Sequence, residues 1–190
     1  MRTLAITQNV TVDGAVEMLD DWFDPQGQAG ADDDGLLAEL HRQDEASDAF
    51  LVGRRTFEDL RGYWRDLADD TTGISDYLNR VPKYVVSRTL TTPEWEPTTV
   101  LRGIDDVAAL KERPGKDVVV TGSISLCHDL VRAGLVDEYR FFTYPAVQGR
   151  GRRLFPDDLP DEVRPSRLEL LGAREFAGGI TLARYRVPRP

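Results

Sequence analysis

Short apolar runs that alternate with helical patterns constrain the fold of this chain most strongly. The segment DVVVTGS (Asp117–Ser123) is rich in β-branched residues, and the segment behind it, SISLCHDLVRAGL (Ser123–Leu135), has helical spacing. A short continuous apolar run is typical of a strand that is buried on both faces. Strand–helix units of this kind pack as a mostly parallel sheet covered by helices, so the sequence predicts an α/β fold.

The same pattern recurs along most of the chain. We expect strands at Arg2–Val10, Ala49–Gly53, Lys83–Ser87, Thr98–Leu101 and Val136–Val147, and helices at Leu36–Ala46, Arg54–Trp64 and Ile104–Gly115. Thr56 is a plausible N-terminal cap of the second helix, with Glu58 and Asp59 in its first turn. Two late strand-like segments, joined by Ala177–Gly179, read as an antiparallel hairpin at the sheet edge.

Length and composition favour one domain over residues 1–190. The chain has 190 residues, of which 41% are hydrophobic, and it shows neither a repeat nor a linker. Its net charge of −9 argues against binding to nucleic acid or to an anionic membrane. The polar N-terminus and the lack of a long apolar run predict a soluble, cytoplasmic protein.

Three predicted strand ends carry residues suited to an anion. In an α/β sheet, ligands bind beyond the carboxyl ends of the strands, where helix N-termini offer free N–H groups. The first end is VGRRT (Val52–Thr56), where glycine allows close approach and arginines can pair with phosphate; a solvated helix face is the other interpretation. The others are VVSRT (Val85–Thr89), which taken alone favours an ordinary strand exit, and VVVTGSISL (Val118–Leu126), which resembles a phosphate-binding turn without the spacing of a known motif.

Other constellations are weaker. His41 and His128 lack neighbours at metal-ligand spacing, so we expect no zinc site. The acidic stretch Asp32–Gly35 lacks the alternating ligands of a calcium loop and reads as a solvated loop. Cys127 is the only cysteine, which excludes an intramolecular disulfide, and it falls in an apolar helical pattern. Asp13, in NVTVDG, is either a turn-former before Gly14 or a carboxylate that can bind the N–H groups of a heterocycle.

Six segments in this order resemble the dihydrofolate reductase superfamily. They are NVTVDG, LVGRRTFEDLRGYW, PKYVVSRTL, VVVTGSISL, GLVDEYRFFTYPAVQGRGRRLF and the closing ITLARYRV, and they span nearly the whole chain. The branch that this chain resembles is related to the C-terminal reductase domain of bifunctional riboflavin-biosynthesis deaminase-reductases. The resemblance implies a three-layer α/β/α fold, with a mostly parallel central sheet and an antiparallel C-terminal edge hairpin.

The resemblance also implies a cofactor and its contacts. It predicts NADPH binding and hydride transfer to a small pyrimidine-like or pteridine-like heterocycle. By match to the family motifs, the cofactor contacts would be Gly53, Arg54, Arg55 and Thr56 along the phosphates, Ser87 and Arg88 near the adenosine 2′-phosphate, and Thr121, Gly122, Ser123 and Ile124 at the pyrophosphate and nicotinamide ribose. Dihydrofolate reductases have a cis Gly-Gly bond at this turn, which Thr121–Gly122 matches. Asp13 would contact the substrate.

The chain departs from its relatives in two respects. Dihydrofolate reductases keep an acidic residue on the first helix, but the matching position lies near Leu37, between Asp34 and Glu39. The riboflavin-type enzymes carry the aspartate that Asp13 matches, yet no deaminase segment with its zinc signature is present here. A reductase for the ribosylaminopyrimidine intermediate is the leading interpretation. A dihydrofolate reductase and a non-catalytic dinucleotide-binding protein are the alternatives, and a homodimer is expected.

Overall fold

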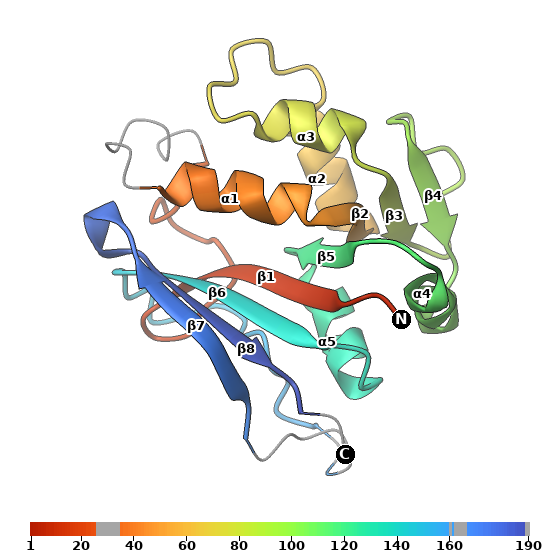
Figure 1. Cartoon of the computed structure of the whole chain (residues 1–190). Helices are drawn as coiled ribbons and strands as arrows, with labels where there is room; N and C mark the ends of the chain where they lie inside the picture. Colours follow the sequence, from red (N-terminus) through yellow and green to blue (C-terminus); the bar gives the residue numbers. More distant parts are fainter. Residues whose placement is uncertain (26–34, 160, 162–166, 189–190) are drawn as a thin grey trace.

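The computed structural model describes residues 1–25, 35–159, 161 and 167–188. The strands are β1 (Leu4–Thr11), β2 (Ser47–Gly53), β3 (Lys83–Val86), β4 (Thr98–Leu101), β5 (Asp117–Thr121), β6 (Glu138–Tyr144), β7 (Glu169–Glu175) and β8 (Thr181–Arg186). The helices are α1 (Leu36–Glu45), α2 (Arg54–Trp64), α3 (Ile74–Arg80), α4 (Ile104–Glu112) and α5 (Ile124–Arg132) (Figure 1).

The eight strands form one sheet in the order β4-β3-β2-β5-β1-β6-β8-β7. Every pairing from β4 through to β6 is parallel, whereas β8 runs antiparallel to both β6 and β7. The predicted α/β fold with an antiparallel closing edge is therefore confirmed. The parallel pairings bring the carboxyl ends of β1, β2, β3 and β5 to one edge of the sheet.

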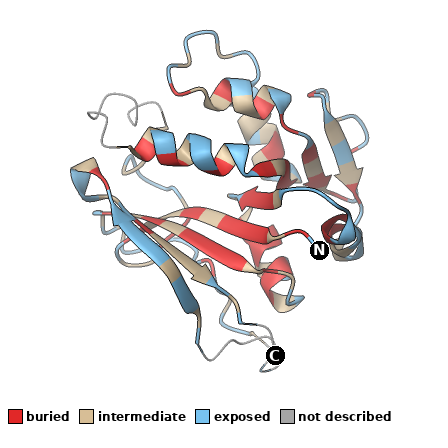
Figure 2. Cartoon of the chain, viewed as in Figure 1, coloured by how far each residue is buried: buried red, intermediate tan, exposed pale blue. Residues whose placement is uncertain are grey.

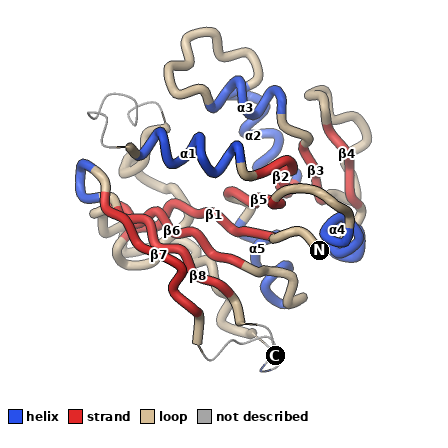
Figure 3. The backbone as a smooth tube through the Cα atoms, viewed as in Figure 1, coloured by secondary structure: helices blue, strands red, loops and turns tan. Residues whose placement is uncertain are grey.

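The helices cover both faces of the sheet, with α1, α2 and α3 on one side and α4 and α5 on the other (Figures 1 and 3). The core beneath α4 and α5 is the larger apolar cluster, built around Leu4, Ile6, Val118 and Val120. The central strands are buried, while the edge strand β7 is mostly exposed (Figure 2). This burial on two faces explains why β5 reads as a continuous apolar run in the sequence.

The structure corrects two expectations about the helices. Helix α2 begins at Arg54 with Gly53 as its cap, so Thr56 is not the cap and no acidic residue lies in the first turn. The reason is that β2 passes directly into α2 at Gly53, without an intervening loop. Helix α3, which follows the left-handed Gly73, was absent from the sequence-based assignment. It is only seven residues long, too short for a clear helical period.

The long segment between β1 and α1 is described in part. Trp22 and Phe23 lie edge-on to Tyr144, with ring centroids 5.5 and 5.6 Å from it. Most of the acidic stretch Asp32–Gly35 lies outside the described residues, as does the rest of 26–34. Among the described residues, no helix combines the length and the apolar character needed to cross a membrane.

Candidate functional site

The N-termini of helices α2 and α5 meet at the carboxyl edge of the sheet. Strands β2 and β5 are parallel neighbours, and each leads directly into its helix. The backbone N–H of Gly53 donates to Ser123 Oγ at 2.8 Å, which joins the two strand–helix junctions. The first and third of the predicted phosphate-binding segments therefore form one continuous surface.

The turn between β5 and α5 has an unusual backbone. Gly122 has φ +67° and Ser123 has φ +60°, so two consecutive residues are left-handed. The left-handed φ of Gly122 favours glycine, and a Cβ added there would lie 3.1 Å from Thr56 Cγ2, so a larger residue would have to displace the Thr56 side chain. The cis peptide among the described residues is Glu96–Pro97, so Thr121–Gly122 does not share the cis bond of the matching pair in dihydrofolate reductases. Two left-handed residues make the turn here instead.

Both helix N-termini are electropositive. The first N–H groups of an α-helix have no partner within it, and no side chain caps α2 or α5. Neither helix has an acidic residue in its first turn, so the positive end of each dipole is not neutralised there. Arg54 pairs with Glu58 at 3.3 Å, whereas the exposed Arg55 has no side-chain partner among the residues that the structure describes.

A buried amide supports the turn from below. Gln8 on β1 donates through Nε2 to the Gly122 carbonyl at 3.1 Å, and Cys127 Sγ donates to the same oxygen at 3.3 Å. Burial raises the pKa of Cys127 to about 12, so the thiol stays neutral and acts as a donor. Gln8 was not among the predicted site residues, although an amide in the middle of a mostly apolar strand was an available signal.

The Ser87–Leu90 turn, which follows β3, holds its own shape. Ser87 is buried, and its Oγ accepts the backbone N–H groups of Thr89 and Leu90 at 3.2 and 2.9 Å. Arg102, which sequence analysis did not single out, donates from Nη1 to the Ser87 and Leu90 carbonyls, both at 3.0 Å. Arg88 is exposed, and within the described residues its side chain has no partner. The structure thus gives Ser87 a role in building the turn.

Asp13 lies in the turn after β1 and binds the loop after β6. Its carboxylate accepts from Thr11 Oγ1 at 2.6 Å and from the backbone N–H groups of Gln148 and Gly149 at 3.1 and 2.7 Å. These donors, the Thr11 hydroxyl above all, lower the pKa of Asp13 to about 2. Asp13 is therefore ionised and linked to a neighbouring loop.

The predicted residues share one edge of the sheet but occupy different parts of it. Four of the predicted residues lie next to one another at the junction of α2 and α5: Gly53, Thr56, Gly122 and Ser123. The turn that carries Arg88 follows β3, next to β2, while Asp13 follows β1 on the other side of β5. Thr121 is exposed at the end of β5, and Ile124 is buried at the start of α5. The edge therefore has two electropositive helix N-termini at its centre, with Arg88 to one side and Asp13 to the other.

An acidic residue does lie on the inner face of α1. Glu39 is buried against the sheet, where burial acts to raise its pKa, but hydrogen bonds from Arg42 and Gln43 lower it overall. Arg42 Nε donates to Glu39 Oε2 and Gln43 Nε2 to Oε1, both at 2.8 Å. Both carboxylate oxygens are already used inside the helix. The match to the relatives, which placed this position near Leu37, did not show that Glu39 is the acid on the buried face of the helix.

A cavity of about 540 Å³ lies at the opposite, amino-terminal edge of the sheet. Its lining includes His41, Asp44, Tyr77 and Arg80. Burial raises the pKa of Asp44 to about 7, against the opposing influence of His41 and Arg80. Among the described residues, no group of three or more His, Cys, Asp or Glu side chains could hold a metal ion.

The chain resembles several known proteins over most of its length. The RibD C-terminal domain family matches residues 2–182. The uncharacterized protein YyaP of Bacillus subtilis is 32% identical over 142 residues, which is 73% of each chain. Among solved structures, a putative riboflavin biosynthesis protein from Shewanella has a TM-score of 0.68 at 18% identity, covering 98% of this chain and 99% of its own.

Two further structures connect the fold to enzymes of known type. A Thermotoga maritima diaminohydroxyphosphoribosylaminopyrimidine deaminase/5-amino-6-(5-phosphoribosylamino)uracil reductase has a TM-score of 0.66 at 17% identity, covering 98% of this chain and 57% of that one. Dihydrofolate reductase from Enterococcus faecalis, complexed with NADP(H), has a TM-score of 0.61 at 16% identity, covering 98% and 97%. The fold is thus dihydrofolate-reductase-like, and the chain belongs to the RibD C-terminal domain family.

Proposed function

We propose that this protein is an NADPH-dependent reductase that transfers a hydride to a pyrimidine-like or pteridine-like heterocycle. The observation that carries the proposal is the junction of two uncapped helix N-termini, joined by the Gly53–Ser123 hydrogen bond. The free N–H groups and the positive dipole ends of two helix N-termini suit a pyrophosphate. Membership of the RibD C-terminal domain family supports a reductase function.

The residues present fit such a cofactor. The pyrophosphate would lie against the first N–H groups of α2 and α5, with Gly122 allowing close approach of the backbone. Arg55 and Arg88 would supply charge to phosphate groups, since no acidic side chain among the described residues pairs with either guanidinium. This local positive charge is compatible with a chain whose net charge is −9.

The contribution of the protein to the reaction would be placement. When bound, NADPH supplies the hydride from its nicotinamide ring. The chain would hold that ring beyond β5 and β1 and present a substrate to it from the side of Asp13. Asp13 remains the proposed substrate contact, as an ionised carboxylate that can accept heterocycle N–H groups in addition to its loop contacts.

The proposed substrate class follows from the relatives. The Thermotoga protein is named as a reductase of 5-amino-6-(5-phosphoribosylamino)uracil, so a ribosylaminopyrimidine is the leading candidate here. Reduction of dihydrofolate is the second candidate, and the Enterococcus structure supports the fold for it. Glu39 weighs against that candidate, because it is buried and its carboxylate binds Arg42 and Gln43 inside the helix, whereas Asp13 is only half-buried.

Paired titrations of NADPH and NADH test the cofactor assignment. We expect the wild type to bind NADPH, and Arg55→Gln and Arg88→Gln each to weaken binding about tenfold, the loss of one charge-assisted contact. Arg113→Gln, an exposed arginine at the far end of α4, is the matched control and should bind like the wild type. Absence of nucleotide binding by the wild type would refute the proposal.

Turnover separates an enzyme from a non-catalytic binding protein. NADPH oxidation at 340 nm would be followed with the aminopyrimidine intermediate and with dihydrofolate. Oxidation with the aminopyrimidine alone would support the leading substrate. Tight NADPH binding without turnover on any pyrimidine or pteridine would favour the binding-protein alternative.

A further inference from the structure

Two buried side chains beneath the β5–α5 turn hold a single carbonyl oxygen. Gln8 Nε2 donates to the Gly122 carbonyl at 3.1 Å, and Cys127 Sγ donates to the same oxygen at 3.3 Å. Gln8 Nε2 also lies 3.6 Å from Cys127 Sγ, so the two donors contact each other. Gln8 is 2% exposed and Cys127 is fully buried. Gln8 and Cys127 thus form a carbonyl clamp that is closed to bulk solvent.

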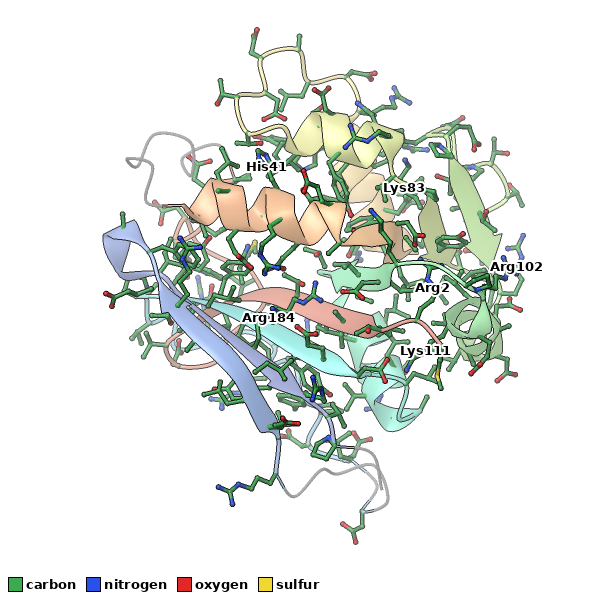
Figure 4. The ribbon with its side chains drawn as sticks, in the orientation of Figure 1. Arg2, His41, Lys83, Arg102, Lys111 and Arg184 are labelled. Atoms are coloured by element: carbon green, nitrogen blue, oxygen red, sulfur yellow. The ribbon has the colours of Figure 1, made fainter. Side chains whose placement is uncertain are left out.

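The carbonyl clamp is uncharged. The cationic side chains labelled in Figure 4 include Lys83, Lys111 and Arg184, and each of these three binds an acceptor in another part of the fold. Burial raises the pKa of Cys127, so its thiol is neutral, and the amide of Gln8 carries no charge. The Gly122 carbonyl is therefore held by the geometry of two neutral hydrogen bonds.

The held carbonyl determines where the next backbone N–H points. The Gly122–Ser123 peptide is trans, and in a trans peptide the C=O and the N–H point in opposite directions. Because the carbonyl points to Gln8 and Cys127, the Ser123 N–H points away from these buried side chains. This N–H has no acceptor within the part of the chain that the structure describes. It therefore adds a donor to the free N–H groups at the start of α5.

The backbone of Ser123 shows that this orientation opposes a local preference. Ser123 has φ +60°, a left-handed conformation that a residue with a Cβ rarely adopts. A flip of the Gly122–Ser123 peptide would turn φ of Ser123 by about 180°, into the extended region that serine favours. The flip would also point the Gly122 carbonyl outward and break both hydrogen bonds of the clamp. The clamp therefore offsets a backbone cost that would otherwise favour the flipped turn.

We propose that Gln8 is a positioning residue for cofactor binding. The carbonyl clamp keeps the Ser123 N–H turned toward the site, where it donates to the pyrophosphate. In the flipped orientation the Gly122 carbonyl would face the same phosphates and repel them. This inference rests on the proposed function and assigns a role in it to a buried residue outside the predicted motifs. Gln8 acts through the turn and does not contact the cofactor.

Replacement of Gln8 by leucine removes the donor at similar volume. NADPH and adenosine 2′-monophosphate would be titrated by calorimetry into the wild type and Gln8→Leu. We expect Gln8→Leu to weaken NADPH about ten- to a hundredfold, the range of one charge-assisted hydrogen bond. The monophosphate should change by less than about twofold, because it has no pyrophosphate. Gln43→Leu, which removes a buried amide on α1, is the matched control and should bind both like the wild type.

Two readouts separate positioning from a structural role. In Gln8→Glu the introduced carboxyl donates to the Gly122 carbonyl only when protonated, so NADP⁺ binding relative to the wild type should recover between about pH 8.5 and pH 5.5. Bound NADP⁺ should also protect the Ser123 backbone amide from hydrogen exchange in the wild type and in Gln43→Leu, but not in Gln8→Leu. Urea denaturation of all variants would verify that they are folded during the titrations.

The outcomes distinguish this inference from the proposed function. Equal losses for NADPH and the monophosphate in Gln8→Leu would show that Gln8 is merely structural and would overturn the inference. Unchanged NADPH binding in Gln8→Leu, or a deficit in Gln8→Glu that does not change with pH, would overturn it as well, while leaving the proposed function standing. A wild type that binds no NADPH would overturn both.

Discussion

Replacement of Gly122 by alanine tests the reasoning about the β5–α5 turn most directly. Gly122 has φ +67°, and an added Cβ would lie 3.1 Å from Thr56 Cγ2. Alanine in a left-handed conformation costs roughly 1–2 kcal/mol relative to glycine. Displacing the Thr56 methyl adds about 1 kcal/mol of overpacking, so we expect Gly122→Ala to lower the free energy of unfolding by about 2–3 kcal/mol.

A double-mutant cycle separates the two contributions. Thr56→Ser removes Cγ2, so in Gly122→Ala/Thr56→Ser the contact disappears while the backbone cost remains. We expect a favourable coupling of about 1 kcal/mol between the two positions. Gly53→Ala is the matched control: its φ is −82° and its nearest neighbour would be Ser123 Oγ at 3.5 Å, so its cost should be under about 0.5 kcal/mol.

Urea denaturation followed by tryptophan fluorescence measures these quantities, and NADPH titration of the folded variants measures the effect on the site. A shifted turn would move Ser123 away from Gly53, so Gly122→Ala should also weaken NADPH binding severalfold. A destabilisation under about 0.5 kcal/mol, or no coupling with Thr56→Ser, would refute the reasoning.

Three further predictions address other parts of the molecule. Burial raises the pKa of Asp44 from 3.8 in the unfolded chain to about 7 in the folded protein. The free energy of unfolding of the wild type should therefore fall as the pH rises through this interval, by at most about 4 kcal/mol. Asp44→Asn should lack this loss. The prediction is contradicted if the urea midpoints of the wild type and of Asp44→Asn change by the same amount between about pH 5 and pH 8. Asp13→Ala should speed hydrogen exchange of the Gln148 and Gly149 backbone amides at neutral pH. In the wild type, the protection of these amides should decrease as the pH falls through the Asp13 pKa of about 2. Unchanged exchange in Asp13→Ala would argue against the loop contact. We also propose a homodimer formed through the exposed β8–β7 edge, where the Leu170 side chain is 57% exposed. Light scattering should then show a dimer that Leu170→Glu dissociates. A monomeric wild type would exclude this dimer.

Local pattern was sufficient to predict most of the elements. The bounds of β4 (Thr98–Leu101) and the start of α1 at Leu36 agree with the sequence-based assignment. Helix α4 ends at Glu112, and Arg113 is already extended, as the stop signal of Pro114 and Gly115 in the predicted Ile104–Gly115 segment indicates. Apolar runs and helical periods depend on nearby residues alone, which is why they are visible before any tertiary contact is known.

The candidate site, too, could be predicted only in part from the sequence. By itself, the sequence determined that glycines, serines and arginines follow predicted strands, and parallel strands bring such residues to one edge. Only the tertiary structure decided that β5, late in the chain, inserts between β1 and β2. That insertion places Gly122 against Thr56 and over Gln8, and the pairing of β3 with β4 places Arg102 on the Ser87–Leu90 turn. These contacts depend on which strands become neighbours, and strand order is set by long-range packing that no local pattern records.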